Sequence, residues 1–301
     1  MKEIYIKARA KVNLNLEILE KRKDNYHNIK SVFQKINLYD EIYIQKSDND
    51  DCQIQTNIEQ LNNKENIIYK AYLKLKEQNP NIKGINVKIN KKIPMQAGLA
   101  GGSTDCASFI LGMNKLFNLK LSKNQIKEIC KNLGADVVPC LYNRAILSQG
   151  IGDIITKINT DLKYYLLIIK PEISCNTKTM YQKLDAKNDI KQIHKSEEII
   201  NALESNNIEK LSHNLYNIFE NVIEEKEIIQ NLKQELIKNG AMGSAMTGSG
   251  SCVYGIFQNK EKAKKVYNIL KDKYQIYICT SYNSLREKEF WSKSFVKYVV
   301  T

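Results

Sequence analysis

The chain begins with an alternation of apolar and polar side chains that predicts a long β-strand over residues 4–18. One face of this strand carries apolar side chains, namely Val12, Leu14, Leu16 and Ile18. The opposite face carries polar ones, namely Lys11, Asn13, Asn15 and Glu17. Asp24 and Asn25 favour a turn, and residues 31–45 predict a further strand. Two consecutive strands are therefore expected at the N-terminus.

The rest of the chain mixes helical and strand patterns. Apolar spacing predicts helices over residues 65–77, 103–117, 122–133, 196–203, 208–219, 226–238 and 260–270. Further strands are predicted over residues 85–89, 144–149, 164–169, 251–257 and 274–282, with turns or loops at 48–51 and 150–153. This order predicts the α+β fold class. The pattern restarts near residue 160, so we expect domains of residues 1–160 and 161–301, with no role assigned to residues 285–301.

Composition and charge narrow the class of protein. The 301 residues are 43% hydrophobic and 26% charged, which is typical of a soluble globular protein. The net charge is +13, from 46 basic and 33 acidic residues, and the lysines are spread along the whole chain. We favour a lysine-rich surface over attraction of a polyanionic substrate, and both over nucleic-acid binding, because nucleic-acid binders usually cluster basic residues on one face.

Two further features bear on the cell compartment and on metals. No apolar run reaches the length of a membrane span, and residues 1–7 lack the apolar core of a signal peptide, so we expect a cytoplasmic protein without a membrane partner. The cysteines are odd in number and form no CxxC pair, which favours reduced thiols over disulfides or a zinc site. They are Cys52, Cys106, Cys130, Cys140, Cys175, Cys252 and Cys279. No metal-ligating residues are predicted.

A glycine-rich loop between the strand at 85–89 and the helix at 103–117 carries the clearest chemistry. Its residues are Pro94, Met95, Gln96, Ala97, Gly98, Leu99, Ala100, Gly101, Gly102, Ser103 and Thr104. Small residues let backbone N–H groups converge, and a helix N-terminus adds unpaired N–H groups, so this loop suits a triphosphate. Ser103 or Thr104 is expected to cap the helix and to offer a hydroxyl to a phosphate or a metal. The alternative is a turn that only joins strand to helix.

Phosphoryl transfer to an alcohol also needs a group that accepts the hydroxyl proton and a cation that holds the developing charge. Lys11 lies on the polar face of the first strand, and Asp136 lies just past the end of the helix at 122–133. If they meet, the Lys11 ammonium would keep Asp136 ionised and polarise the attacking oxygen. From spacing alone, both residues are equally compatible with a solvated surface.

A second cluster of small residues spans 240–251 and precedes the strand at 251–257. We expect it to pack against the loop at 94–104 and to help close the phosphate site. The alternative is a flexible loop that only leads into the strand.

Three segments, in this order, resemble the GHMP kinases, the family of galactokinase, homoserine kinase, mevalonate kinase and phosphomevalonate kinase. They are A-K-V-N-L at 10–14, the loop at 94–104, and M-T-G-S-G at 246–250. D-N-Y-H at 24–27, S-V-F-Q at 31–34, L-G-A-D-V at 133–137 and Q-G-I-G-D at 149–153 are similar to the branch that acts on a diphosphocytidyl methylerythritol alcohol. The resemblance implies an N-terminal domain like domain 2 of ribosomal protein S5 and a ferredoxin-like C-terminal domain.

The same resemblance implies transfer of the γ-phosphate of ATP, with Mg²⁺, to the 2-hydroxyl of that small-molecule alcohol. It makes Lys11 and Asp136 the catalytic pair, and it assigns the ATP phosphates to residues 94–104 and a border of the adenine pocket to Asn66. The implied alcohol-binding residues are Asn13, Tyr26, His27, Tyr181 and Gly248. Tyr26 and Tyr181 would face the cytosine, His27 would hydrogen-bond it, and Asn13 would face the erythritol hydroxyls.

Two departures from the family pattern concern backbone geometry. Ala100 stands where the family usually has glycine, and its Cβ is crowded if that position needs a positive φ. Asn25 also replaces a glycine, but asparagine tolerates left-handed geometry. The rival hypotheses are another GHMP kinase, of the mevalonate or homoserine type, and a catalytically inactive relative that only binds. A monomer or a weak dimer is expected.

Overall fold

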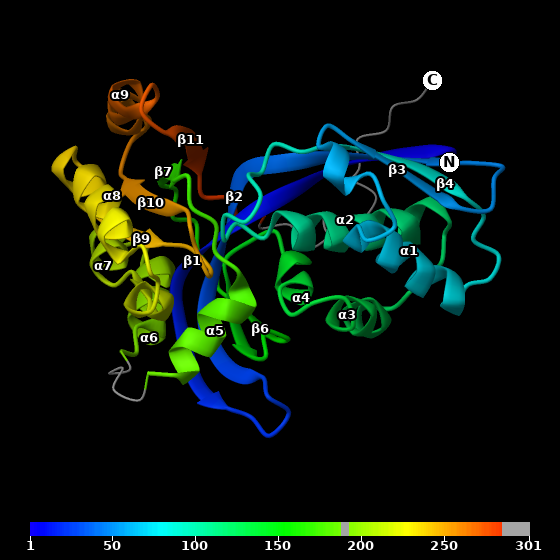
Figure 1. The fold of residues 1–301 in the computed structure, drawn as a ribbon, viewed down its shortest axis with the longest axis horizontal. Coiled ribbons are helices and arrows are strands. Elements are labelled where there is room, and N and C mark those ends of the chain that lie inside the picture. Colours follow the sequence, from blue (N-terminus) through cyan, green and yellow to red (C-terminus); the bar gives the residue numbers. More distant parts are fainter. Residues whose placement is uncertain (188–192, 285–301) are drawn as a thin grey trace.

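Two long antiparallel strands, β1 (Glu3–Lys21) and β2 (His27–Lys46), run along the molecule (Figure 1). The structure is a computed structural model that describes residues 1–187 and 193–284. The predicted strands at 4–18 and 31–45 are confirmed, and each is longer than expected. Asn25 has φ +66° in the turn between them, as expected of an asparagine there.

The first sheet has the order β3-β4-β2-β1-β8, with β5 pairing to β2 and β6 to β5. Its other strands are β3 (Cys52–Thr56), β4 (Ile85–Asn90), β5 (Ile146–Gly150), β6 (Ile154–Lys157) and β8 (Tyr216–Asn217). One side of this sheet is covered by α1 (Ile67–Gln78), α2 (Gly101–Leu116), α3 (Lys123–Lys131) and α4 (Val137–Cys140) (Figure 1). A short 3-10 helix, η1 (Glu59–Leu61), follows β3.

The second sheet has the order β11-β7-β10-β9. Its strands are β7 (Tyr165–Lys170), β9 (Gly243–Met246), β10 (Val253–Phe257) and β11 (Gln275–Thr280). The helices of this half are α5 (Thr177–Asp185), α6 (Ser196–Glu204), α7 (Ile208–His213), α8 (Lys226–Lys238) and α9 (Lys260–Leu270). Helices α8 and α9 pack on the sheet, and both match their predicted ranges. Two sheets with helices packed against them confirm the α+β class.

Two sequence-based expectations in the second half are wrong. The helix predicted over 208–219 ends at His213, and β8 and the 3-10 helix η2 (Ile218–Asn221) follow. The cause is tertiary: Asn217 donates side-chain hydrogen bonds to the carbonyls of Met246 and Gly248, each at 2.8 Å, so the chain is held extended there. The predicted loop at 240–251 contains β9, which pairs with β10.

Strand β1 connects all three hydrophobic clusters of the molecule. Ile4 and Ile6 belong to the cluster under α1 and α2, Val12 and Leu14 to the cluster shared with β7 and β10, and Leu16 and Ile18 to the cluster around α5 and α8. Each fully buried side chain of this size contributes about 1.5–3 kcal/mol. The two halves therefore share a core, and the boundary near residue 160 stays a prediction.

The polar face of β1 is buried as well. Lys11, Asn13, Asn15 and Glu17 are each at most 2% exposed. Glu17 accepts hydrogen bonds from the backbone N–H groups of Lys195 and Ser196 at 2.8 and 2.9 Å. Although burial opposes ionisation, these bonds and the Ser196 hydroxyl lower the pKa of Glu17 below its ordinary value. Helix α6 therefore docks on this face through a fully paired carboxylate.

Two remaining expectations concern the cysteines and the C-terminus. All seven cysteines are free thiols, as expected, and all but Cys175 are buried. Residues 285–301, for which no role was predicted, lie outside the described residues. In the part of the chain that the structure describes, no helix has the combined length and apolarity needed to cross a bilayer.

Candidate active site

A cavity of about 560 Å³ lies where the two halves meet. The first half contributes β1, the loop after β4, the start of α2 and Asp136. The second half contributes residues 175–177, Tyr181, Phe219 and residues 248–250. This volume is typical of sites for small ligands.

The glycine-rich loop forms one wall of the cavity with an unusual backbone. Gln96, Gly98 and Ala100 have φ values of +50°, +71° and +56°, so every second residue is left-handed. Ala100 thus needs the geometry for which glycine is favoured. The carbonyls of Gly98 and Leu99 accept hydrogen bonds from the Thr247 hydroxyl and from the Lys11 N–H, at 3.2 Å each. The loop is therefore anchored through its carbonyl groups.

Helix α2 starts at Gly101, with Ala100 as its N-cap residue and no side-chain cap. The expected cap by Ser103 or Thr104 is therefore wrong, because both lie inside the first turn. A helix leaves its first N–H groups without intrahelical acceptors, so this end favours an anion. A Cβ added to Gly102 would meet no atom within 4 Å, so Gly102 borders open space.

The two hydroxyls of this first turn have different surroundings. Ser103 lines the cavity. Thr104 is 1% exposed; its hydroxyl donates to the Arg9 carbonyl at 2.7 Å and accepts from Lys35 Nζ at 3.1 Å. Burial lowers the pKa of Lys35. The structure thus brings residues 94–103 to the cavity and turns the Thr104 side chain into the core.

Lys11 and Asp136 meet in this cavity. Lys11 Nζ lies 3.7 Å from Asp136 Oδ2, and both side chains line the cavity beside the loop. Lys11 is 2% exposed, whereas the Asp136 side chain is 44% exposed. Lys11 Nζ also donates to Asn13 Oδ1 at 2.7 Å, which fixes the direction of the ammonium. The pairing expected between distant segments is therefore present.

Asn13 ties the two glycine-rich segments together. Its Oδ1 accepts from the Gly248 N–H at 3.0 Å, and its own N–H donates to the Thr247 hydroxyl at 3.0 Å. A Cβ on Gly98 would lie 1.9 Å from the Thr247 carbonyl oxygen, so only glycine permits this approach. The second segment packs against the first, as predicted. Asn13 lines the cavity, but protein partners already engage both its backbone and its side chain.

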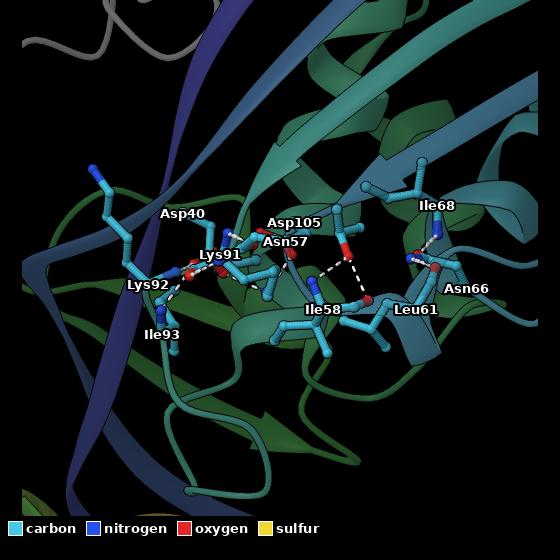
Figure 2. A network of polar contacts seen from close by, with 12 residues as sticks. Asp40, Asn57, Ile58, Leu61, Asn66, Ile68, Lys91, Lys92, Ile93 and Asp105 are labelled. Atoms are coloured by element: carbon cyan, nitrogen blue, oxygen red, sulfur yellow. Dashed lines mark hydrogen bonds and ion pairs between the residues drawn. The ribbon is translucent and has the colours of Figure 1, made fainter. Parts of the chain in front are cut away.

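Asn66 lies at the far side of the loop, as the N-cap residue of α1. Its Oδ1 accepts from the Ile68 N–H at 3.0 Å, and its Nδ2 donates to the Leu61 carbonyl at 3.0 Å (Figure 2). It borders the cavity together with Leu61 and Ile67. The structure thus gives Asn66 a capping contact and a place beside an apolar part of the wall.

The opposite end of the cavity is aromatic. Tyr181 and Phe219 line it, in an edge-to-face contact with ring centroids 5.1 Å apart. His27 stacks on Tyr181 at 5.0 Å, and its Nε2 lies 2.6 Å from Asp185 Oδ1. Tyr26 is 57% exposed, and neither it nor His27 is among the described residues that line the cavity. The structure therefore places His27, and not Tyr26, against Tyr181.

Comparisons with known proteins agree with this geometry. Residues 66–144 match the family model described as GHMP kinases N terminal domain, and residues 199–276 match GHMP kinases C terminal. The chain is 41% identical to the 4-diphosphocytidyl-2-C-methyl-D-erythritol kinase of Clostridioides difficile over 284 residues, covering 92% of this chain and 95% of that protein. The chain belongs to the GHMP kinases, in the branch of the 4-diphosphocytidyl-2-C-methyl-D-erythritol kinases.

Two further likenesses support this placement of the kinase. It is 42% identical to the 4-diphosphocytidyl-2-C-methyl-D-erythritol kinase of Thermoanaerobacter pseudethanolicus, covering 91% of this chain and 94% of that protein. A crystal structure of a 4-(cytidine 5'-diphospho)-2C-methyl-D-erythritol kinase superposes with a TM-score of 0.80 at 23% identity, covering 93% of this chain and 100% of that one. The structural likeness shows the fold alone, which is the expected two-part GHMP kinase fold.

Sequence reasoning missed one buried ionic cluster in this kinase. Lys91 Nζ lies between the carboxylates of Asp40 and Asp105, and Lys91 and Asp105 line the cavity (Figure 2). Burial raises the pKa of Asp105 to about 8, more than the Lys91 ammonium lowers it, and the charge of Asp40 adds to the rise. The only signal in the sequence is a lysine just before the loop and an aspartate just after it.

Proposed function

We propose that this kinase transfers the γ-phosphoryl group of ATP to the 2-hydroxyl of 4-diphosphocytidyl-2-C-methyl-D-erythritol, giving the 2-phosphate and ADP in the non-mevalonate route to isoprenoid precursors. The observation that carries the proposal is the 3.7 Å approach of Lys11 to Asp136 beside an anchored phosphate loop in one cavity. The identities of 41% and 42% with kinases of that name support the choice of alcohol.

The transfer step assigns a role to each charged group. The hydroxyl oxygen forms a bond to the γ-phosphorus while the bond from that phosphorus to the bridging oxygen of ADP breaks, and the electron pair leaves with ADP. The hydroxyl proton passes to the Asp136 carboxylate. The Lys11 ammonium stabilises the negative charge on the acceptor oxygen and the phosphoryl group. Because the transition state is loose, Asp136 also orients the hydroxyl.

The phosphates of ATP would lie against the loop at 94–103 and the start of α2. Their charge would meet the first N–H groups of the helix, and the left-handed residues of the loop keep its carbonyls turned to the protein. The adenine would lie beside Asn66 and Leu61, where the cavity wall is partly apolar.

Mg²⁺ fits the donors that this cavity offers. Among the described residues no group of three or more His, Cys, Asp or Glu side chains is placed to hold a metal ion. Mg²⁺ instead takes few protein ligands and completes its shell with phosphate oxygens and water. Among the oxygens at the cavity surface, those of the Ser103 hydroxyl and the Asp136 carboxylate would hold it. When bound, the ion would neutralise charge on the transferring phosphate.

The cytidine part of the alcohol would occupy the aromatic end of the cavity. We propose that Tyr181 forms one wall of the cytosine site, that Tyr26 stacks on the base and that His27 hydrogen-bonds it. The exposure of Tyr26, at 57%, leaves its ring available for such a contact. Gly248 and Asn13 would border the erythritol, since both line the cavity next to Lys11.

We propose that the kinase acts in the cytoplasm as a monomer or a weak dimer, without a nucleic-acid or membrane partner. We also propose residues 1–160 and 161–301 as its domains.

An ADP-release assay over candidate alcohols tests the proposed reaction. With ATP and Mg²⁺, we expect ADP release only with the diphosphocytidyl alcohol, and none with mevalonate or homoserine. Turnover of mevalonate or homoserine, without turnover of the diphosphocytidyl alcohol, would instead support the rival kinases. A salt-sensitive shift of nucleic acid, with no ADP release from any alcohol, would support the inactive binding relative.

A further inference from the structure

The buried cluster of Asp40, Lys91 and Asp105 joins three separate elements at the base of the phosphate loop. Asp40 belongs to β2, Lys91 follows β4, and Asp105 lies near the start of α2. Lys91 Nζ donates to a carboxylate oxygen of Asp40 and, at 2.5 Å, to Asp105 Oδ2 (Figure 2). The exposed fractions of the Lys91, Asp40 and Asp105 side chains are 5%, 0% and 5%. All three side chains are therefore largely shielded from bulk water.

The cluster also fixes the backbone where the loop begins. Asp40 Oδ1 accepts from the Lys92 N–H at 2.5 Å and from the Ile93 N–H at 2.8 Å, directly before Pro94 (Figure 2). Asn57, which follows β3, exchanges two hydrogen bonds with the backbone of Lys91, at 2.7 and 3.1 Å. The chain that enters the loop is thus held by one side chain from β2 and by one that follows β3.

The end of the loop is held by the same lysine. Lys91 binds Asp105, which is the fifth residue of α2, and a Cβ on Gly101 would lie 3.5 Å from Lys91 Nζ and 3.2 Å from Ile93 Cγ2. The cluster therefore closes the base of the loop and holds its first and last residues next to each other.

The loop needs such a restraint because its backbone is disfavoured. Gln96 and Ala100 carry a Cβ, yet both are left-handed, with φ values of +50° and +56°. Without a restraint, these residues would relax toward right-handed or extended geometry. That relaxation would turn carbonyl groups toward the space where phosphates are expected.

One atom of the cluster, Asp105 Oδ1, belongs to a residue that lines the cavity. Asp105 Oδ1 has no hydrogen-bond partner among the described residues, although Asp105 is 4% exposed and lines the cavity. A buried polar atom without a partner is costly, so its persistence in a cavity wall indicates a role toward a ligand. The cluster is thus part of the cavity surface.

We propose that Asp40, Lys91 and Asp105 form a clamp that holds the phosphate loop in its nucleotide-binding geometry before ATP arrives. The clamp positions the loop and takes no part in the proton transfer at Asp136. It acts on the affinity for ATP and leaves the affinity for the alcohol and the rate of the bound complex nearly unchanged.

The test compares steady-state constants of Asp105→Asn and Asp40→Asn in the full chain. Each substitution keeps the side-chain shape and replaces one of the two carboxyl groups that pair with Lys91 by an amide. We expect the KM for ATP to rise about tenfold in each variant, with the KM for the alcohol and kcat within about twofold. An unchanged KM for ATP in either folded variant would contradict the clamp proposal. An equal rise of the KM for ATP and the KM for the alcohol would contradict it as well.

A matched control separates the clamp from a general loss of stability. Glu17→Gln removes an equally buried carboxylate that holds α6 and lies outside the cavity lining. We expect it to lower the melting temperature while leaving the KM for ATP unchanged. A rise of the KM for ATP in Glu17→Gln that matches the rise in Asp105→Asn would contradict the clamp. It would show that the loss of any buried carboxyl group raises this KM.

A rescue variant tests the restraint itself. Glycine is left-handed at little cost, so Ala100→Gly should make the loop less dependent on the clamp. We expect the KM for ATP of Asp105→Asn to fall at least threefold when Ala100→Gly is added. If Asp105→Asn does not fold, Asp40→Asn serves as the background, and the absence of rescue in the folded background contradicts the proposal.

The inference rests on the proposed kinase reaction only for its readout. Failure of the wild-type chain to turn over the diphosphocytidyl alcohol would defeat the proposed function. Normal wild-type turnover with an unchanged KM for ATP in the clamp variants would defeat the clamp alone.

Discussion

The two ends of the cavity are built in different ways. At the phosphate end, the backbone N–H groups of Lys11 and Cys252 and the Thr247 hydroxyl donate to the carbonyls of the loop, and a glycine allows the two glycine-rich segments to touch. At the aromatic end, contacts between side chains prevail: His27 stacks on Tyr181 and pairs with Asp185, while Tyr26 is exposed. One end is therefore fixed by backbone, and the other depends on rotatable side chains.

This difference shows which kinds of binding residue can be assigned reliably from a sequence motif. A backbone cradle is encoded by small residues at fixed spacing, so the sequence localises it well. A base-stacking site is encoded by side chains whose rotamers depend on their neighbours, so a matched residue can lie outside the cavity lining, as Tyr26 does. Variants at the two ends should accordingly affect different kinetic constants.

The largest effect is expected at the phosphate end, from Asp136→Asn. The variant keeps the shape of the side chain but loses the proton acceptor and the charge that faces Lys11. We expect kcat to fall by about two to four orders of magnitude, with ATP binding retained. Turnover assays and ATP titrations check both parts, and Asp161→Asn, at an exposed site outside the cavity lining, provides the control. A kcat within a few-fold of wild type would remove Asp136 from the mechanism.

A smaller effect, on a different constant, is expected at the aromatic end. Tyr26→Ala should raise the KM for the diphosphocytidyl alcohol about tenfold while kcat stays near wild type, because stacking on a base is worth about 1–3 kcal/mol. Tyr43→Ala is the matched control, since Tyr43 is 47% exposed on the sheet and does not line this cavity. Equal KM values in the two variants would show that Tyr26 does not contact the base.

A third effect, on stability, is a pH dependence of opposite sign at the two ends. Burial raises the pKa of Asp105 to about 8 from an ordinary 3.8. Between these values the folded chain holds a proton that the unfolded chain releases, so Asp105 makes stability fall as pH rises from about 4 to 8. Although burial opposes it, pairing with Lys21 and His27 lowers the pKa of Asp185, so its contribution is present above about pH 4 and lost as pH falls further.

Urea unfolding at pH 5 and pH 8 measures this dependence. We expect the wild type to lose more stability between the two values than Asp105→Asn does, because the variant has no proton to release at that site. Asp185→Asn should keep the wild-type difference over this window. Identical differences for the wild type and Asp105→Asn would contradict a raised pKa at Asp105.

The sequence predicts the parts of the fold in which local pattern and tertiary contacts agree. The alternation in β1 and the apolar spacing of α8 and α9 were sufficient for those elements. At Asn217 they disagree, because hydrogen bonds to Met246 and Gly248 override a helical pattern. The overlooked strand β9 consists mostly of small residues, and its pairing with β10 is visible only in three dimensions.

In the candidate site, too, some features could be predicted from the sequence and others depend on tertiary contacts. Lys11, Asp136 and the loop at 94–103 share one cavity, as the resemblance to the GHMP kinases implied. The inward turn of Thr104 was not predictable, because it depends on Arg9 and Lys35 from other strands. The clamp was missed for a similar reason: its residues come from β2, from the chain after β4 and from α2, and they meet only after the first sheet forms.

The destination of the γ-phosphorus tests the central claim most directly. Wild-type kinase, ATP, Mg²⁺ and the diphosphocytidyl alcohol would be followed by phosphorus NMR until the ATP is consumed. The account predicts one new phosphomonoester, on the 2-hydroxyl of the alcohol, in equal amount to the ADP formed. Inorganic phosphate as the sole new phosphorus product, or ADP formation that does not depend on the alcohol, would contradict it.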